Sequence, residues 1–141
     1  MSSYANTYKS QQIQTASQEQ ILILLYEGAI RFLSLAKYGH EEKNMEKFHN
    51  NIIKCQRIIM EFMSTLDIEV GGEMAQNLYQ LYEYLHYRLV QANLKKDVAM
   101  IEEVLSHLRE LKATWEEAIG LARQEKATFN QDNQQGHVYS A

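Results

Sequence analysis

The chain has 141 residues, 45% of them hydrophobic and 23% charged, which is enough for one domain with a buried core. The net charge is −4, and charges of both signs are interspersed along the sequence. No segment forms the basic stripe that nucleic-acid binding requires. There is no proline, and the longest apolar run, Ile21 to Tyr26, is too short to span a bilayer. With no signal-peptide pattern at the N-terminus, we expect a cytoplasmic protein without membrane insertion.

The first 16 residues lack helical periodicity and are interpreted as an arm that carries Tyr4, Tyr8 and Ile13 among polar neighbours. Ser17 follows, with Gln20 three residues later, which is the spacing of a capping box and predicts a helix start. Gly39 predicts the end of this first helix. Its apolar stripe is formed by Ile21, Leu25, Ala29, Phe32 and Ala36.

A second helix is predicted to start near Asn44 and to return antiparallel after a short loop. Its heptad consists of Met45, Phe48, Ile52, Cys55, Ile59, Phe62 and Leu66. A further apolar line lies on one flank of the heptad and is formed by Ile53, Met60 and Met63. The lone cysteine falls within the heptad and is interpreted as packing. The segment 67–72 contains a glycine pair and is predicted to be the next loop.

The third helix, predicted over 73–97, has more apolar surface than one neighbour can cover. Its stripe consists of Met74, Leu78, Leu81, Leu85, Leu89 and Ala92, and it is widened on one flank by Ala75, Tyr79, Tyr82 and Val90. Together they occupy roughly 180° of the helix, against the ~100° that a surface helix needs. Such a helix either lies in the middle of a bundle or offers its spare face to another chain.

Asp97 is predicted to cap a fourth helix. The stripe of this helix consists of Ile101, Val104, Leu105, Leu108, Leu111, Trp115, Ile119 and Ala122. From about Lys126 the sequence is polar, which predicts a frayed or disordered end. The pattern predicts an all-α fold, an antiparallel up-down-up-down four-helix bundle. We expect an arm over 1–16, the bundle over 17–127 and a flexible polar tail over 128–141.

Two sequence motifs match a ligand pair of di-iron bundles: Glu46-x-x-His49 and Glu83-x-x-His86. Glu83 lies nearly opposite the apolar stripe of its helix, and Glu46 lies well off its own stripe. The other two helices have no inward carboxylate. A metal-binding bundle enzyme is therefore a minor alternative, and no cofactor or metal is expected. No nucleophile or phosphate-binding motif indicates another enzyme.

The two flanks are interpreted as one binding surface for an amphipathic helix or an extended apolar segment. Methionine repacks easily, and tyrosine combines apolar contact with a hydroxyl. The predicted binding residues are Ile53, Met60, Met63, Tyr79, Tyr82 and Val90. Tyr4, Tyr8 and Ile13 of the arm could cover them as a displaceable lid. Two alternatives stay open: packing within the bundle, and pairing with a second copy of the chain.

Five segments of the chain form a recognisable series: TASQEQILILLYEGAIRFL (15–33), GGEMAQNL (71–78), LYEYLHYRLVQANLKKD (81–97), IEEV (101–104) and LKATWEEA (111–118). In this order and spacing they resemble the FliS family of flagellar secretion chaperones. The matches run collinearly from about Tyr8 to Ala118. Tyr8 matches the arm tyrosine of the family by its distance from the TAS junction, whereas the spacing of Tyr4 departs from that pattern.

The resemblance implies a chaperone, not an enzyme. Members of this family bind the disordered C-terminal segment of flagellin, prevent its polymerisation in the cytosol and deliver it to the flagellar type III export apparatus. The implied partners are therefore flagellin and components of that apparatus. The resemblance also implies that the arm occupies part of the binding surface when no client is bound. We expect the free protein to be a monomer or a weak homo-oligomer.

Overall fold

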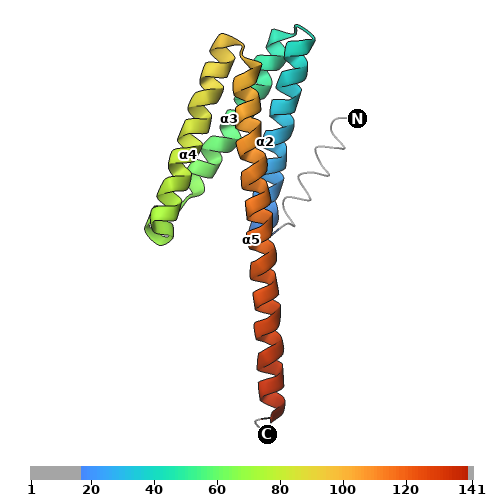
Figure 1. Ribbon diagram of the computed structural model, residues 1–141, viewed down its shortest axis with the longest axis vertical. Helices are drawn as coiled ribbons and strands as arrows, with labels where there is room; N and C mark the ends of the chain where they lie inside the picture. Colours follow the sequence, from blue (N-terminus) through green and yellow to red (C-terminus); the bar gives the residue numbers. More distant parts are fainter. Residues whose placement is uncertain (1–16, 140–141) are drawn as a thin grey trace. The chain divides into compact units, whose positions relative to one another are not determined.

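A computed structural model describes residues 17–139 of the chain, with side chains for residues 17–134. The described residues form helices and contain no strand. The helices are α2 (Gln18–Glu41), α3 (Met45–Thr65), α4 (Ile68–Lys95) and α5 (Val98–Tyr139). Within residues 24–110 they alternate in direction (Figure 1), which confirms the antiparallel up-down-up-down four-helix bundle.

The chain divides into two compact units. The larger unit, 24–110, contains every buried hydrophobic side chain of the described residues. The described part of the smaller unit consists of 17–23 and 111–139, and it includes a half-buried Trp115 and an ion pair between Arg123 and Glu19 at 3.6 Å. Helices α2 and α5 each contribute residues to both units.

The core of the larger unit lies along the middle of the predicted stripe of α3, the second half of that of α4 and the first half of that of α5, whereas Met45, Met74 and Ala122 of these stripes are exposed. On α3, Phe48, Ile52, Cys55 and Ile59 are fully buried, and Phe62 is almost so. The core residues of α4 are Ala75, Tyr82, Leu85, Leu89 and Ala92, and those of α5 are Ile101, Val104, Leu105 and Leu108. On α2 the prediction was less accurate, because Tyr26 and Leu33 are buried while Leu25 and Phe32 of the predicted stripe are only half-buried.

Three of the helix starts are capped, two of them by the predicted caps Ser17 and Asp97 and the third by Asn44, near which a helix start was predicted. The Ser17 amide donates to Gln20 Oε1 at 3.1 Å and the Gln20 amide donates to Ser17 Oγ at 3.2 Å, the reciprocal pair of a capping box. Asn44 Oδ1 accepts from the Lys47 amide at 3.0 Å at the start of α3. Asp97 Oδ1 accepts from the Ala99 amide at 2.9 Å at the start of α5. Each cap satisfies amides that have no partner within the helix.

Two predicted boundaries were wrong, and the last helix is longer than its predicted apolar stripe. Helix α2 passes through the buried Gly39 and ends at Glu41, with Lys43 in the left-handed conformation at φ 58°. Helix α4 begins within the predicted loop at Ile68, capped by Asp67, and Gly72 interrupts its helical dihedrals with φ 59° and ψ −136°. Helix α5 continues beyond Lys126, and its backbone is helical to Tyr139.

Candidate functional site

Among the described helices, α3 and α4 have the most extensive backbone contact with each other. Asn93 Nδ2 of α4 lies 2.7 Å from His49 Nδ1 of α3, which marks the side on which the two helices face each other. On a helical wheel, Ile53 and Met60 lie within about 40° of His49, while Tyr79 and Val90 lie within about 60° of Asn93. The two predicted flanks therefore lie along the same α3–α4 seam.

The antiparallel direction of the helices fixes which residues lie level with one another. Fourteen residues beyond His49 on α3 is Met63, and fourteen residues before Asn93 on α4 is Tyr79, so these two share one level. By the same count, Ile53 lies within one residue of the level of Val90. The apolar residues thus follow the seam over about three turns on both helices.

Five of the six predicted binding residues are accessible. Met60 is 54% exposed and Val90 is 37% exposed, while Ile53, Met63 and Tyr79 are half-buried. These five residues are called the α3–α4 face below. Their partial exposure leaves side-chain area that a partner can bury.

The sixth predicted binding residue, Tyr82, belongs to the core. It is 2% exposed, and its hydroxyl forms a hydrogen bond with the hydroxyl of Tyr26 on α2. The Phe62 ring packs against both tyrosines, with its centroid 4.4 Å from that of Tyr26 and 5.3 Å from that of Tyr82. Because its hydroxyl is paired inside the bundle, Tyr82 can be buried whole and is inaccessible to a partner.

The sequence reasoning missed an apolar surface at the connection between α3 and α4. Ile68, Val70 and Met74 are exposed by 39%, 86% and 79%, and together they are called the connection patch. Met74 was predicted in the core stripe of its helix, which was wrong. It lies two residues after Gly72, where the helical path is interrupted, and the first buried residue of α4 is Ala75. The Gly71–Gly72 pair in the sequence could have indicated that the helical periodicity of α4 does not predict burial at this end of the helix.

A polar cluster joins α4 to α5 on the opposite flank of α4. Arg88 donates to Glu103 Oε2 from Nη2 at 2.7 Å and from Nε at 3.0 Å, and the Tyr84 hydroxyl donates to Glu103 Oε1. The hydrogen bond from Tyr84 has the largest effect, and together with those from Arg88 it lowers the pKa of the Glu103 carboxyl below its ordinary value. The bond to Glu103 likewise raises the pKa of Tyr84. The side chains of this flank are held by contacts within the chain. The apolar side chains on the α3–α4 side are therefore the better candidates for contact with a partner.

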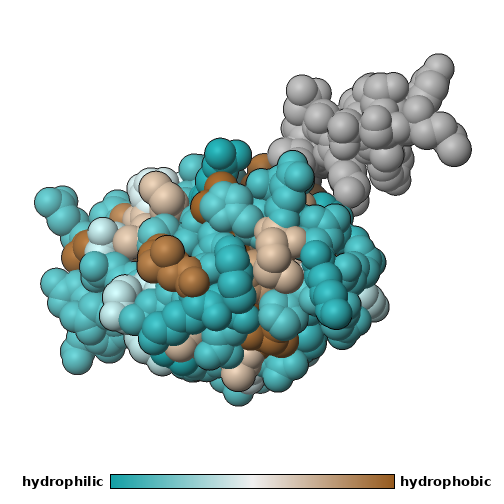
Figure 2. Space-filling model, turned by 90° about the horizontal axis from the view of Figure 1, so that it is seen from above, coloured by the Kyte–Doolittle hydropathy of each residue, from teal (hydrophilic) through white to brown (hydrophobic). Residues whose placement is uncertain are grey.

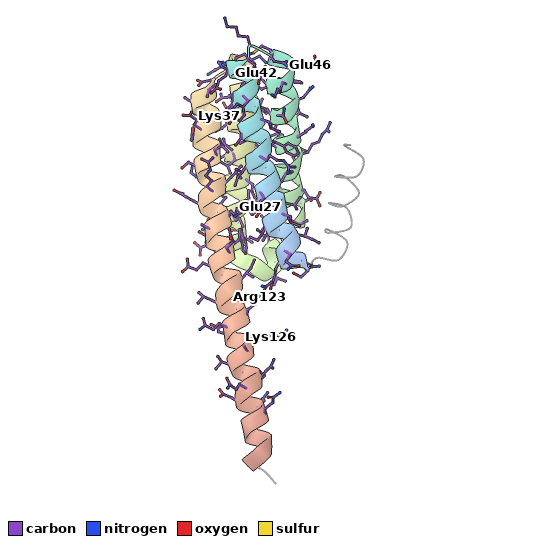
Figure 3. The ribbon with its side chains drawn as sticks, turned by 90° about the vertical axis from the view of Figure 1, so that its right-hand side faces the viewer. Glu27, Lys37, Glu42, Glu46, Arg123 and Lys126 are labelled. Carbon is purple, nitrogen blue, oxygen red and sulfur yellow. The ribbon has the colours of Figure 1, made fainter. Side chains whose placement is uncertain are left out.

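The two motifs of the metal hypothesis are not brought together as ligands. Glu46 and Glu83 are both exposed, and Glu46 is seen at the end of the larger unit, beside Glu42 (Figure 3). His49 Nδ1 lies against the Asn93 amide. Among residues 17–134, no group of three histidine, cysteine or acidic side chains is arranged to hold a metal ion. The structure therefore gives no support to a metal-dependent enzyme.

Cys55 is fully buried on α3, and desolvation raises the pKa of its thiol far above the ordinary value. A thiol in such a place is a packing group, since a nucleophile must be both accessible and deprotonated. The packing interpretation made from the sequence fits this geometry.

The molecular surface is mainly hydrophilic at the end where α2 joins α3 and α4 joins α5, with separate hydrophobic areas (Figure 2). In the described part of the chain, no helix is long and apolar enough to cross a membrane. Tyr4, Tyr8 and Ile13 of the predicted arm lie outside the described residues.

Comparison with known proteins shows what kind of bundle this is. The family model described as flagellar protein FliS matches residues 1–122. The chain belongs to the FliS family. It is 33% identical over 119 residues to the flagellar secretion chaperone FliS of Bacillus subtilis, covering 84% of this chain and 88% of that protein.

The flagellar secretion chaperones FliS of Vibrio cholerae and Escherichia coli are each 32% identical to this chain over 117 residues. The match covers 83% and 82% of this chain respectively, and 86% of each relative. The chain is thus a FliS-family flagellar secretion chaperone, a class of proteins without enzymatic activity. The matched region includes all of α2, α3 and α4 and ends within α5 at residue 122.

Proposed function

We propose that the chain binds the disordered C-terminal segment of flagellin on the α3–α4 face. In this role it acts in the cytoplasm, prevents premature polymerisation of flagellin and delivers it to the flagellar type III export apparatus. The observation that carries the proposal is the α3–α4 face itself: five apolar side chains from two helices, partly exposed along one seam, in a chain of the FliS family.

The chemistry of the face suits a client that is unfolded before it binds. Filament-forming segments expose apolar stripes in the monomer, and a chaperone must bury these stripes reversibly. Met60 and Met63 repack around different side chains, and Tyr79 offers a ring and a hydroxyl in the same contact. Because the client must become ordered on binding, its affinity is moderate for the area that it buries, and release needs neither nucleotide nor metal.

In the same proposal, the arm formed by residues 1–16 covers the α3–α4 face when no client is present. Its apolar residues Tyr4, Tyr8 and Ile13 would then be displaced by the client. Self-association through this face remains the competing role, and sedimentation across a concentration range distinguishes it from a monomer that awaits its client.

Calorimetric titration with a peptide of the last ~40 residues of the cognate flagellin tests the function, since that length can supply an interface of standard size. We expect one-to-one binding with a large negative heat-capacity change, which marks apolar burial coupled to folding. No binding at high micromolar peptide would overturn the proposal.

The location of the site is tested by two single variants, Met60→Ala and Tyr79→Ala. Each is expected to weaken peptide binding about tenfold, because truncation of a central interface residue typically costs more than ~1 kcal/mol. The matched control is Tyr38→Ala, which removes another exposed tyrosine, 57% accessible, from the outer surface of α2. Equal binding by all three variants and the parent chain would place the site elsewhere.

A further inference from the structure

The helical hairpin that forms the α3–α4 face has a long stretch without positive charge. From Ile58 to Tyr87 the sequence contains no lysine and no arginine, and it contains Glu61, Asp67, Glu69, Glu73 and Glu83. All five carboxylates are exposed. Within residues 17–134, none of the five takes part in an ion pair. Within the described side chains, none of these carboxylates is therefore neutralised by a directly paired cation.

The other end of the same hairpin is balanced. Around the α2–α3 and α4–α5 connections, the segments 41–47 and 95–97 carry Glu41, Glu42, Glu46 and Asp97 against Lys43, Lys47, Lys95 and Lys96. One of these pairs, Lys47 with Glu42, lies at 3.4 Å. The α3–α4 face thus runs from a neutral end near His49 to an acidic end near Asp67.

At the acidic end, the charged residues are interspersed in the sequence with exposed apolar residues. Ile68 and Val70 alternate in sequence with Asp67 and Glu69, and Glu73 directly precedes the 79% exposed Met74. Glu83 lies one helical turn beyond Tyr79 on the outer side of α4. An apolar patch with acidic side chains around it favours a partner whose own apolar stripe is bordered by cations.

We propose that the α3–α4 face and the connection patch together receive a cationic amphipathic helix, docked with its lysine- or arginine-bearing part over the connection patch. This inference rests on the proposed function and adds the charge and the direction of the bound client segment. An acidic segment would approach carboxylates that have no directly paired cation and would be repelled. Charge of this kind at the rim of an interface sets orientation and discriminates against wrong partners.

The first test uses the flagellin peptide and the double variant Glu73→Lys with Glu83→Lys. Both residues are exposed, so folding is expected to survive, and far-UV circular dichroism checks that it does. We expect binding to weaken about tenfold at ~50 mM salt, because two exposed attractive contacts become repulsive. The difference in affinity between the variant and the parent chain should shrink severalfold at ~500 mM salt, because the salt screens the interaction between charges.

Two control variants match the change in charge. Glu46→Lys reverses an exposed carboxylate at the neutral end of α3, and Glu117→Lys reverses one on α5. Each is expected to leave the affinity within twofold of the parent chain. If the double variant also stays within twofold, or if the controls weaken binding as much, charge at the acidic end does not orient the client.

The second test uses two synthetic 20-residue amphipathic peptides with the same apolar positions and either lysine or glutamate beside them. The parent chain should bind the lysine peptide at least tenfold more tightly, and the double variant should lose or reverse this preference. Equal affinity for both peptides would overturn the inference. The inference would also be overturned if binding of the flagellin peptide changed neither with salt nor with the substitutions Glu73→Lys and Glu83→Lys. That result would leave the proposed function intact. Absence of flagellin-peptide binding would instead count against the proposed function.

Discussion

The three aromatic rings of Tyr26, Phe62 and Tyr82 show how a tyrosine becomes part of this core. The ring of Phe62 stacks on Tyr26 with an interplanar angle of 26° and lies at 30° to Tyr82. The hydroxyls of the two tyrosines bond to each other, which removes the penalty for burying them. Met60 lies two residues from Phe62 in the sequence and is more than half exposed. Core and exposed apolar surface therefore alternate within a single turn of α3.

This alternation predicts opposite outcomes for two truncations. Tyr82→Ala should lower the free energy of unfolding by about 3–5 kcal/mol, as expected for a large aromatic side chain removed from a core. Met60→Ala should lower it by less than about 1 kcal/mol, since most of that side chain already meets water. Urea unfolding followed by circular dichroism measures both changes. Comparable losses for the two variants would contradict this assignment of core and surface.

Burial of Cys55 predicts that its thiol is protected in the folded chain. The raised pKa keeps the group protonated at neutral pH, and the thiolate is the reactive form. An aromatic disulfide reagent at pH 8 should therefore modify Cys55 at least ~100-fold more slowly in the native protein than in denaturant. Fast modification of the native protein would show that α3 opens locally around this residue.

At the scale of the elements, the end of α2 explains why Gly39 was misread as a helix terminus. The Asn44 amide donates to the Gly39 carbonyl at 2.7 Å and the Lys43 amide donates to the His40 carbonyl at 3.1 Å, which is the Schellman pattern. The left-handed position of this motif is occupied by Lys43. Gly39 is needed for a different reason: a Cβ there would lie 2.8 Å from the Phe48 amide nitrogen and 3.1 Å from the Asn44 carbonyl oxygen.

Two substitutions at this turn should therefore act in opposite directions. Gly39→Ala should destabilise the protein by about 1–3 kcal/mol, because the new methyl group meets backbone atoms that cannot move aside independently. Lys43→Gly should stabilise it by up to about 1 kcal/mol, because glycine adopts the left-handed conformation without a steric penalty. Thermal unfolding of the two variants beside the parent chain measures the signs. Two shifts in the same direction would contradict this account of the turn.

The contrast between helix starts and helix ends shows which parts of the fold could be predicted. The caps Ser17 and Asp97 were predicted correctly from the sequence because a cap bonds to amides two or three residues away, and the helix start predicted near Asn44 is capped by that residue. The end of α2 depends on how closely α3 approaches, which is a tertiary property. The polar end of α5 has few apolar residues to indicate burial, yet its backbone is helical to Tyr139.

The candidate site could be predicted in part for a similar reason. Periodicity placed Ile53, Met60 and Val90 at the margins of their stripes, and these margins are partly exposed. Tyr82 lies at a comparable margin, but a hydroxyl contributed by α2 completes its burial. A wheel drawn on one helix contains no information about a partner 56 residues away in the sequence.

At the scale of the whole molecule, the family match and the helices end at different places. The FliS match stops at residue 122, whereas α5 continues for another 17 residues. Residues 120–134 are all exposed, including Leu121 at 54% and Phe129 at 64%. Every core residue of the larger unit precedes this segment. The segment beyond the match is therefore not required by that core.

Truncation after residue 122 tests this conclusion. The shortened chain should lose helical signal in proportion to the residues removed, while its Tm stays within about 4 °C of the parent value, a shift that corresponds to ~1 kcal/mol or less. Truncation after residue 110 is the comparison, because it also removes the half-buried Leu111 and Trp115. If truncation after residue 122 lowered the Tm by much more than about 4 °C, the end of α5 would be shown to support the bundle.

The position of Trp115 makes the two units optically distinguishable. It is the only tryptophan of the chain, and it belongs to the smaller unit, whereas the buried tyrosines 26 and 82 belong to the larger one. Tryptophan emission excited at ~295 nm therefore reports the surroundings of residues 111–139 and 17–23, while far-UV ellipticity reports every helix. Coincident melting curves from the two signals would mean that the units unfold as one cooperative body, and an earlier emission change would mean that the smaller unit opens first.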